Sequence, residues 1–191
     1  MKTIFFKILI VVGLVVNIMY CKAQTLPLNT WVENTPNNAH LKDLDNELVP
    51  YIGTYKANYK GNEITLFITK EEDKLIKYSD KQFYKDVLLI KYIVKNSSGI
   101  IIQDTQNINH ASYFKITSMG TMPPLEKVAF SYSGTNCGVG WGQIDLKKLN
   151  ATQISWDYYP NSMILDEATC PSGTDTKVYL PHTKGLIFTK Q

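Results

Sequence analysis

Two aspartates on consecutive predicted strands are the first side chains whose types and spacing could support catalysis. Asp145 and Asp157 each lie in a segment where polar and apolar residues alternate. A pair of carboxylates on either side of a glycosidic bond is the usual machinery of glycoside hydrolysis. The same alternation, however, places both aspartates opposite the apolar face, so we expect both to point to solvent. They are not predicted to form a catalytic pair.

The other residue types that support catalysis or metal binding are isolated in the sequence. His40, His110 and His182 are far apart and have no ligand spacing. No serine lies in a G-x-S-x-G elbow or beside a histidine. The acids within 43–47 alternate as calcium ligands do, but they lack the glycine that such a loop needs for its turn. We therefore predict no catalytic residue, no metal site and no cofactor, in a chain that is not an enzyme.

The first 23 residues have the pattern of a secretory signal. Lys2 and Lys7 flank the start of an apolar run that ends near Tyr20, and the tripeptide CKA follows. Charge, a short apolar core and a small-x-small ending are typical of a signal peptide, here cleaved after Ala23. The protein is therefore predicted to be secreted or periplasmic. The alternatives are a retained membrane anchor and a lipoprotein attached at Cys21, although a lipoprotein site has a small residue where this chain has a bulky tyrosine.

The apparent basicity of the chain belongs to this signal. The sequence has 20 Lys and no Arg against 17 Asp plus Glu, and three of the lysines lie within residues 1–23. The balanced charge that remains predicts no nucleic-acid partner. The absence of Arg also removes the usual bidentate group for phosphate.

A glycine-rich loop at 133–142 brings a cysteine and a tryptophan together. Cys137 in this loop and Cys170 are the cysteines outside the signal, and in an exported chain we expect them to form a disulfide. Closely spaced glycines permit tight backbone approach, which suits a bulge at a disulfide corner. The alternative is a ligand site at the mouth of a barrel, with three ligand-binding aromatic residues: Trp141, Trp156 and Tyr158.

Alternation with a period of two dominates residues 51–191 and predicts about ten short strands. Its centre is 128–159, where three consecutive strands are expected around Phe130, Ile144 and Trp156. An alternating face must be buried against another sheet or inside a closed barrel, and closure leaves no exposed edge. We therefore predict an all-β fold, an antiparallel up-and-down β-barrel of about 8–10 strands.

Residues 24–50 are predicted to form an extended lead-in and one short N-terminal helix ahead of the barrel domain. Leu41, Leu44 and Leu48 fall at i, i+3 and i+7, which is the spacing of one helix face. Trp31 in the lead-in is expected to pack against the domain as an apolar plug.

The segment 87–102 departs from the alternation because it is apolar on both faces. A strand of this kind is covered on both sides or awaits a partner. We expect the predicted helix at 41–48 to be the second cover, which favours a monomer. The alternative is that this hairpin docks on another protein.

Two resemblances extend these expectations. The motif Gly53-x-Tyr55 at the start of the first barrel strand is similar to the G-x-W motif of the lipocalin and fatty-acid-binding group, with Tyr in place of Trp. That resemblance implies a barrel with a ligand in its interior. The segments YIGTYKANYKGNEITLFITKEE, KYIVKNSSG, TNCGVGWGQIDLKKLNATQISWDYYP and LIFTKQ resemble an uncharacterised family of small secreted proteins of Bacteroidetes-type bacteria. This second resemblance covers most of the exported chain and implies no known activity.

The function predicted from these observations is binding. The first hypothesis is a secreted, lipocalin-like barrel that holds a small apolar or amphipathic ligand in its interior. An interior packed solid with side chains would argue against it. The alternative is a surface or periplasmic protein-interaction module without a ligand cavity. Membrane contact is expected only through the signal peptide or through lipidation at Cys21.

Overall fold

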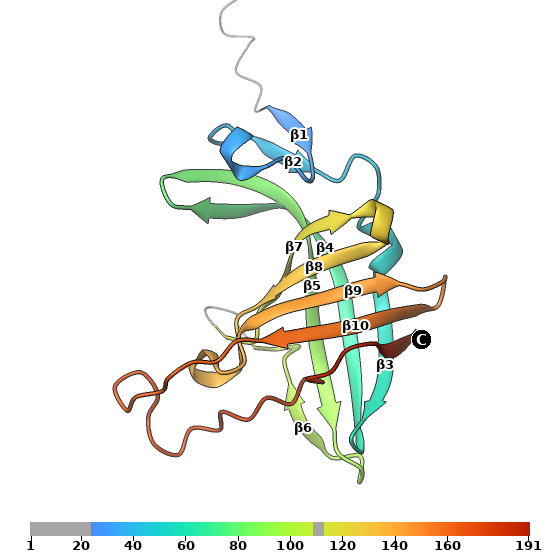
Figure 1. Cartoon of the computed structure of the whole chain (residues 1–191), viewed down its shortest axis with the longest axis vertical. Coiled ribbons are helices and arrows are strands. Elements are labelled where there is room, and N and C mark those ends of the chain that lie inside the picture. Colours follow the sequence, from blue (N-terminus) through green and yellow to red (C-terminus); the bar gives the residue numbers. More distant parts are fainter. Residues whose placement is uncertain (1–23, 109–112) are drawn as a thin grey trace, which may run out of the picture.

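The computed structural model describes residues 24–108 and 113–191, and these residues are almost entirely β-structure (Figure 1). The strands are β1 (Thr25–Pro27), β2 (His40–Lys42), β3 (Gly53–Tyr59), β4 (Asn62–Tyr78), β5 (Lys81–Lys95), β6 (Ile101–Asp104), β7 (Ile116–Met122), β8 (Lys127–Tyr132), β9 (Gly142–Lys148), β10 (Gln153–Pro160) and β11 (Leu186–Lys190). Four short 3₁₀ turns connect them: η1 (Val32–Asn34), η2 (Val49–Tyr51), η3 (Pro123–Leu125) and η4 (Asn136–Gly138).

Eight of these strands close into a barrel. Each of β3, β4, β5, β7, β8, β9, β10 and β11 pairs antiparallel with the next, and β11 pairs with β3 to complete the circle. Neighbours in space are therefore neighbours in sequence, apart from β6, which pairs with β5 beside the barrel. The predicted fold class, an antiparallel up-and-down barrel, is confirmed.

The apolar residues that alternate along the predicted strands lie in the barrel interior, as predicted. Trp156, Phe130, Ile144 and Leu66 have no exposed surface, and Tyr55 is 1% exposed. Complete burial of a large apolar side chain contributes roughly 1.5–3 kcal/mol to stability. The alternation in the sequence thus reflects the main source of stability in this fold.

The barrel closes weakly between β5 and β7, as it does between β11 and β3, where two residue pairs also join the strands. The two pairs between β5 and β7 are Leu89 with Thr117 and Ile90 with Ile116. Beyond them, the backbone of Tyr92 bonds to Thr105, and β6 continues along β5. β5 therefore pairs with β7 along one part of its length and with Thr105 and β6 along the next part.

The β4–β5 hairpin continues past the barrel as an arm, residues 74–85, which projects beneath β1 and β2 in Figure 1. A β-bulge between Glu71 and Lys74 separates the arm from the barrel part of β4. An extra residue in one strand bends that strand and increases its twist. On the other side of the arm, β2 pairs parallel with β5, with His40 opposite Tyr84. The arm and the two N-terminal strands thereby form a small sheet of their own.

The predicted helix at 41–48 is wrong, and so is the predicted packing of Trp31. Leu41 pairs with β5 as part of β2, and the carboxylate of Asp43 accepts hydrogen bonds from the N–H groups of Glu47 and Leu48. These side-chain bonds compete with the helical hydrogen bonds that the leucine spacing suggested. Trp31 is 76% exposed, so it does not pack against the domain as an apolar plug.

Candidate functional site

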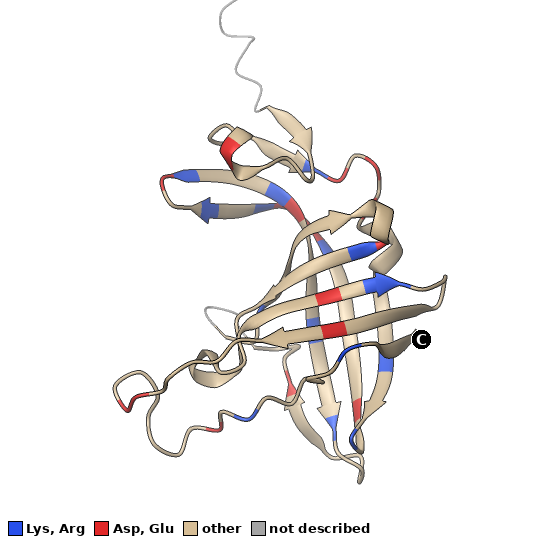
Figure 2. Cartoon of the chain, viewed as in Figure 1, with Lys and Arg blue, Asp and Glu red and all other residues tan. Residues whose placement is uncertain are grey.

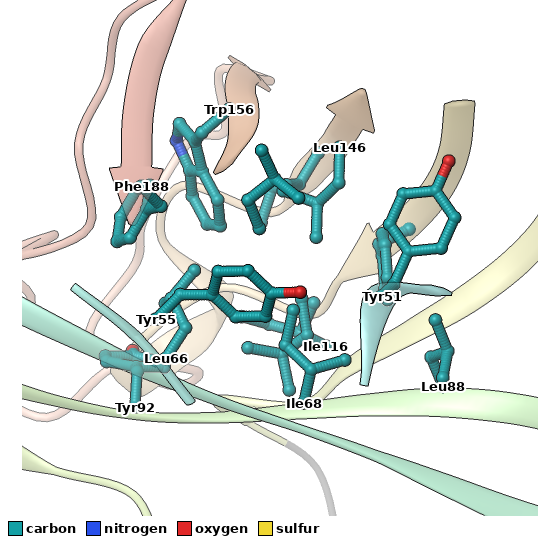
Figure 3. Close-up of a cluster of buried hydrophobic side chains, with 14 of the residues drawn as sticks. Tyr51, Tyr55, Leu66, Ile68, Leu88, Tyr92, Ile116, Leu146, Trp156 and Phe188 are labelled. Atoms are coloured by element: carbon teal, nitrogen blue, oxygen red, sulfur yellow. The ribbon is translucent and has the colours of Figure 1, made fainter. Parts of the chain in front are cut away.

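Two of the three predicted ligand-binding residues lie in the interior of the barrel, among the buried core side chains. Trp156 and Tyr158 are fully buried, and Trp156 Nε1 donates a 2.9 Å hydrogen bond to the carbonyl oxygen of Pro181. Figure 3 shows Trp156 and Phe188 facing Tyr55 across the interior, with Leu146 beside them. Trp141, in contrast, lies outside the barrel with 48% of its surface exposed. The three aromatic residues therefore do not line one common site.

The tyrosines in this interior are neutral hydrogen-bonding groups of the core. The hydroxyls of Tyr92 and Tyr132 lie 3.3 Å apart, and the hydroxyl of Tyr158 donates to the carbonyl oxygen of Gly140. Burial raises the pKa of Tyr132 to about 12 and raises the pKa of Tyr92 and Tyr158 as well. A phenol with a pKa this high stays protonated at neutral pH, so these groups serve as hydrogen-bond partners in the core.

Both ends of the barrel are covered by segments outside the strands. Leu28, Leu48 and Tyr51 precede β3 and belong to the hydrophobic core at one end. At the other end, Phe114 and Leu180 belong to the same core. The best-formed hollows among the described residues lie on the surface instead, and their volumes range from about 110 to about 500 Å³.

A group of buried charges holds the base of the arm. Asp86 lies opposite the bulge and accepts hydrogen bonds from the N–H groups of Asp43 and Asp73, each at 3.1 Å. Lys42 Nζ lies 3.1 Å from Asp86 and 2.8 Å from Asp73, and Lys70 Nζ lies 3.2 Å from Asp43. Asp43 and Asp86 have lysine and backbone partners, and Asp73 has Lys42 and His40. No group of metal-binding side chains occurs among the described residues. This arrangement is suited to holding the bulge in place.

The two aspartates considered for catalysis are neighbours in the register of β9 and β10, and Figure 2 shows acidic positions on both strands. Asp145 is only 3% exposed, which corrects the expectation that both carboxylates point to solvent. Lys127 on the adjacent strand β8 reaches it at 2.6 Å and covers it. Asp157 accepts a 2.6 Å hydrogen bond from the N–H of Gly185. Both carboxylates thus have partners on the outer wall of the barrel.

The predicted disulfide is confirmed, and it is surrounded by exposed apolar side chains. Cys137 and Cys170 are bonded, with their Cα atoms 5.5 Å apart. Met163 lies against Gly138, the residue after Cys137, and Asn161 donates its N–H to the carbonyl oxygen of Trp141. Four residues at this place expose 41% or more of their surface, and we call them the disulfide corner: Trp141, Met163, Ile164 and Leu165.

A glycine permits the tight backbone crossing at this corner. Gly134 has φ +84°, and a Cβ at this position would lie 2.2 Å from the carbonyl oxygen of Gly138. The close approach leaves no room for a side chain, and residues other than glycine rarely adopt this left-handed conformation. The sequence prediction of a glycine-dependent disulfide corner in 133–142 thus agrees with the local structure.

One family model covers the whole chain, residues 1–191. This chain belongs to DUF6705, a family of unknown function. No curated protein and no solved structure matches it. The resemblance to an uncharacterised family is therefore confirmed, and the function of this DUF6705 protein has to be argued from its own geometry.

The disulfide also bears on the compartment in which the DUF6705 chain works. Disulfides persist in oxidising environments such as the extracellular space and the periplasm. Among residues 24–108 and 113–191, no helix is long and apolar enough to cross a membrane. The predicted signal peptide and Cys21 lie outside the described residues.

Replacing Cys137 and Cys170 of the DUF6705 protein by serine is expected to lower the free energy of unfolding by about 3–4 kcal/mol. The disulfide joins residues 33 apart, and its loss frees that loop in the unfolded chain. Urea unfolding of the wild type and the double variant measures the difference. The folded spectrum should stay the same because neither cysteine belongs to the core. A loss below about 0.5 kcal/mol would show that the loop is already constrained by other contacts.

Sequence reasoning missed the apolar character of the disulfide corner. The signal was present as three consecutive apolar residues, Met163 to Leu165, in an otherwise polar loop between two prolines. A second feature it missed is a recess rimmed by lysines at the seam of the barrel. No local pattern indicates it, because its lysines come from three separate elements.

Proposed function

We propose that this chain is an exported, non-enzymatic binding module that engages a protein partner through the disulfide corner. The observation that carries the proposal is the contrast between the two groups of apolar side chains. Those inside the barrel are buried and covered at both ends, whereas Trp141 and Ile164 are 48% and 94% exposed. Clustered exposed apolar residues mark interaction surfaces, and tryptophan is enriched at the energetic centres of interfaces.

Export supports this assignment. A signal peptide cleaved after Ala23 would deliver the chain to a compartment where the Cys137–Cys170 bond is stable. The bond attaches the loop that presents Ile164 to the loop of Trp141. A constrained loop loses less conformational entropy on binding, so the disulfide favours recognition by this surface.

A photo-crosslinking amino acid at position 164 tests the proposal in the native compartment. We expect a discrete adduct of higher mass from position 164. The matched control places the same photo-crosslinking amino acid at Ser172, an exposed residue of the same long loop that is not part of the disulfide corner. Equal labelling from both positions, or no adduct from 164, would contradict the proposal.

The second candidate is a small apolar or amphipathic ligand held in the barrel, as the lipocalin-like motif at Gly53-x-Tyr55 suggests. Such a ligand would have to displace side chains such as Leu48 and Tyr51, which are buried at one end. Native mass spectrometry of the protein purified from its own compartment distinguishes the two candidates. The first predicts the mass of the chain alone, and the second predicts an additional mass that is lost on unfolding.

A further inference from the structure

A recess lies at the seam where the arm leaves the barrel. Its volume is about 110 Å³, the space of roughly four water molecules. The arm, β5 and the start of β7 supply its lining: Lys74, Leu89, Ile90, Lys91, Lys115 and Ile116. Only two residue pairs join β5 to β7 at this point, and the bulge bends the arm away from the barrel. The recess is therefore a direct result of the weak closure and the bend.

The charge of the recess is positive. Lys74 is paired with Glu71 at 2.5 Å, but neither Lys91 nor Lys115 has a carboxylate within 4.0 Å of its ammonium. All 17 carboxylate side chains of the protein lie in the described residues, so residues 1–23 and 109–112 contribute no acid. Lys91 donates instead to the carbonyl oxygen of Gln106 at 2.6 Å, which leaves its charge unbalanced.

A second observation at the same wall indicates an absent polar partner. The hydroxyl of Thr117 is buried and has no hydrogen-bond partner among the described residues. Thr117 is the direct cross-strand partner of Leu89, which lines the recess. The side chains of such partners lie roughly 5 Å apart. A buried hydroxyl without a partner is unfavourable. This unpartnered group lies beside the recess, although Thr117 does not itself line it.

We infer that this recess binds a small monocarboxylate with a short apolar tail. The ammonium groups of Lys91 and Lys115 attract the carboxylate, and the apolar part of the lining, at Leu89, Ile90 and Ile116, receives the tail. The volume limits the occupant to a head group and a few carbons. This site is separate from the disulfide corner, and its existence does not depend on the proposed protein partner.

Titration of the ¹⁵N-labelled protein with butyrate tests the inference. We expect saturable shifts of the backbone amides of 89–91 and 115–117, with a Kd on the order of 1 mM, as suits a ligand of this size. The Lys115→Gln variant should weaken binding at least five-fold, because it removes an unpaired positive charge and leaves a polar, slightly shorter side chain. The matched control, Lys147→Gln, removes an exposed lysine from β9 on another part of the barrel and should bind butyrate as the wild type does.

Two further probes define the ligand class. Butyramide has the same tail without the charge, and inorganic phosphate has the charge without the tail. Both should bind at least five-fold more weakly than butyrate. The inference is overturned if butyramide or phosphate binds as well as butyrate, if Lys115→Gln binds as the wild type does, or if the amides around the recess do not respond. None of these outcomes affects the crosslinking at position 164, so the two proposals fail independently.

Discussion

Replacing Asp86 by Ala is expected to lower the free energy of unfolding by about 3–5 kcal/mol. The Asp86 side chain is 4% exposed and lies between Lys42 and Lys70, at 3.1 and 3.8 Å. Its removal takes away the acceptor of the N–H groups of Asp43 and Asp73. Each of the two lysines also loses one carboxylate partner, although Lys42 keeps Asp73 and Lys70 keeps Asp43. Loss of one member of a buried ionic group is costly because buried N–H groups lose their partner and the remaining charges are only partly compensated. Urea unfolding at pH 7 measures the effect.

The matched control for Asp86 is Glu72→Ala. Glu72 lies 3.9 Å from Lys70, but its side chain is 69% exposed, so its loss should change stability by less than about 0.5 kcal/mol. If the two variants have the same stability, the buried charges do not hold the arm in place. An Asp86→Ala protein that loses only the arm would instead show proteolysis confined to 74–85, with the barrel intact.

The same charges predict a dependence of stability on acid pH. Burial opposes ionisation of Asp86, but the bonds from backbone N–H groups and Lys42 outweigh it, so its pKa lies below the usual value. The hydrogen bonds from Lys42 and His40 likewise lower the pKa of Asp73. A carboxylate with a lowered pKa stabilises the folded state above its unfolded pKa of about 3.9, and this contribution is lost as pH falls through the folded pKa. The stability difference between wild type and Asp86→Ala should therefore shrink below about pH 4.

Replacing Trp156 by Ala is also expected to cost about 3–5 kcal/mol, the range for a large aromatic residue removed from a core. Trp156 is fully buried, contacts Phe188 at a ring-centroid distance of 5.7 Å and donates to Pro181. The carbonyl oxygen of Pro181 loses one of its two hydrogen-bond donors in the variant and keeps the N–H of Thr183, so the cavity is the main cost.

Trp141→Ala is the matched control, since Trp141 is 48% exposed and should cost less than about 0.5 kcal/mol. Equilibrium unfolding in urea compares the two tryptophan variants. Similar unfolding midpoints for the two variants would mean that the packing of Trp156 does not stabilise the core. A Trp156→Ala protein that gains affinity for indole would in addition show that the cavity persists in the folded barrel.

Much of the barrel could be predicted from alternation alone, because a strand that is buried on one face has an apolar residue at every second position. Phe130, Ile144 and Trp156 were assigned to one interior in this way, and all three are there. The predicted helix at 41–48 failed for the opposite reason. The leucine spacing in this segment fits a helix as well as it fits the observed structure. The difference was decided by Leu41, which pairs with a strand more than forty residues away.

The candidate sites were less accessible to sequence reasoning. The disulfide followed from cysteine number and export. The roles of Trp141, Trp156 and Tyr158 did not follow, because alternation says which face a residue is on and nothing about whether the interior is full. The burial of Asp145 depends on Lys127 from a neighbouring strand, and a local pattern cannot show that register.

By itself, the sequence determined the all-β class, the up-and-down barrel and the Cys137–Cys170 bond, since each is a property of local period or residue count. Only the tertiary structure decided that Trp156 and Tyr158 lie in the barrel core while Trp141 lies outside it. It also decided that lysines surround the buried Asp86 and that two unpaired lysines line a recess. These features arise where segments distant in the chain meet. Their charge balance and remaining volume depend on strand register and on the bend of one hairpin, and neither is encoded in any single stretch of residues.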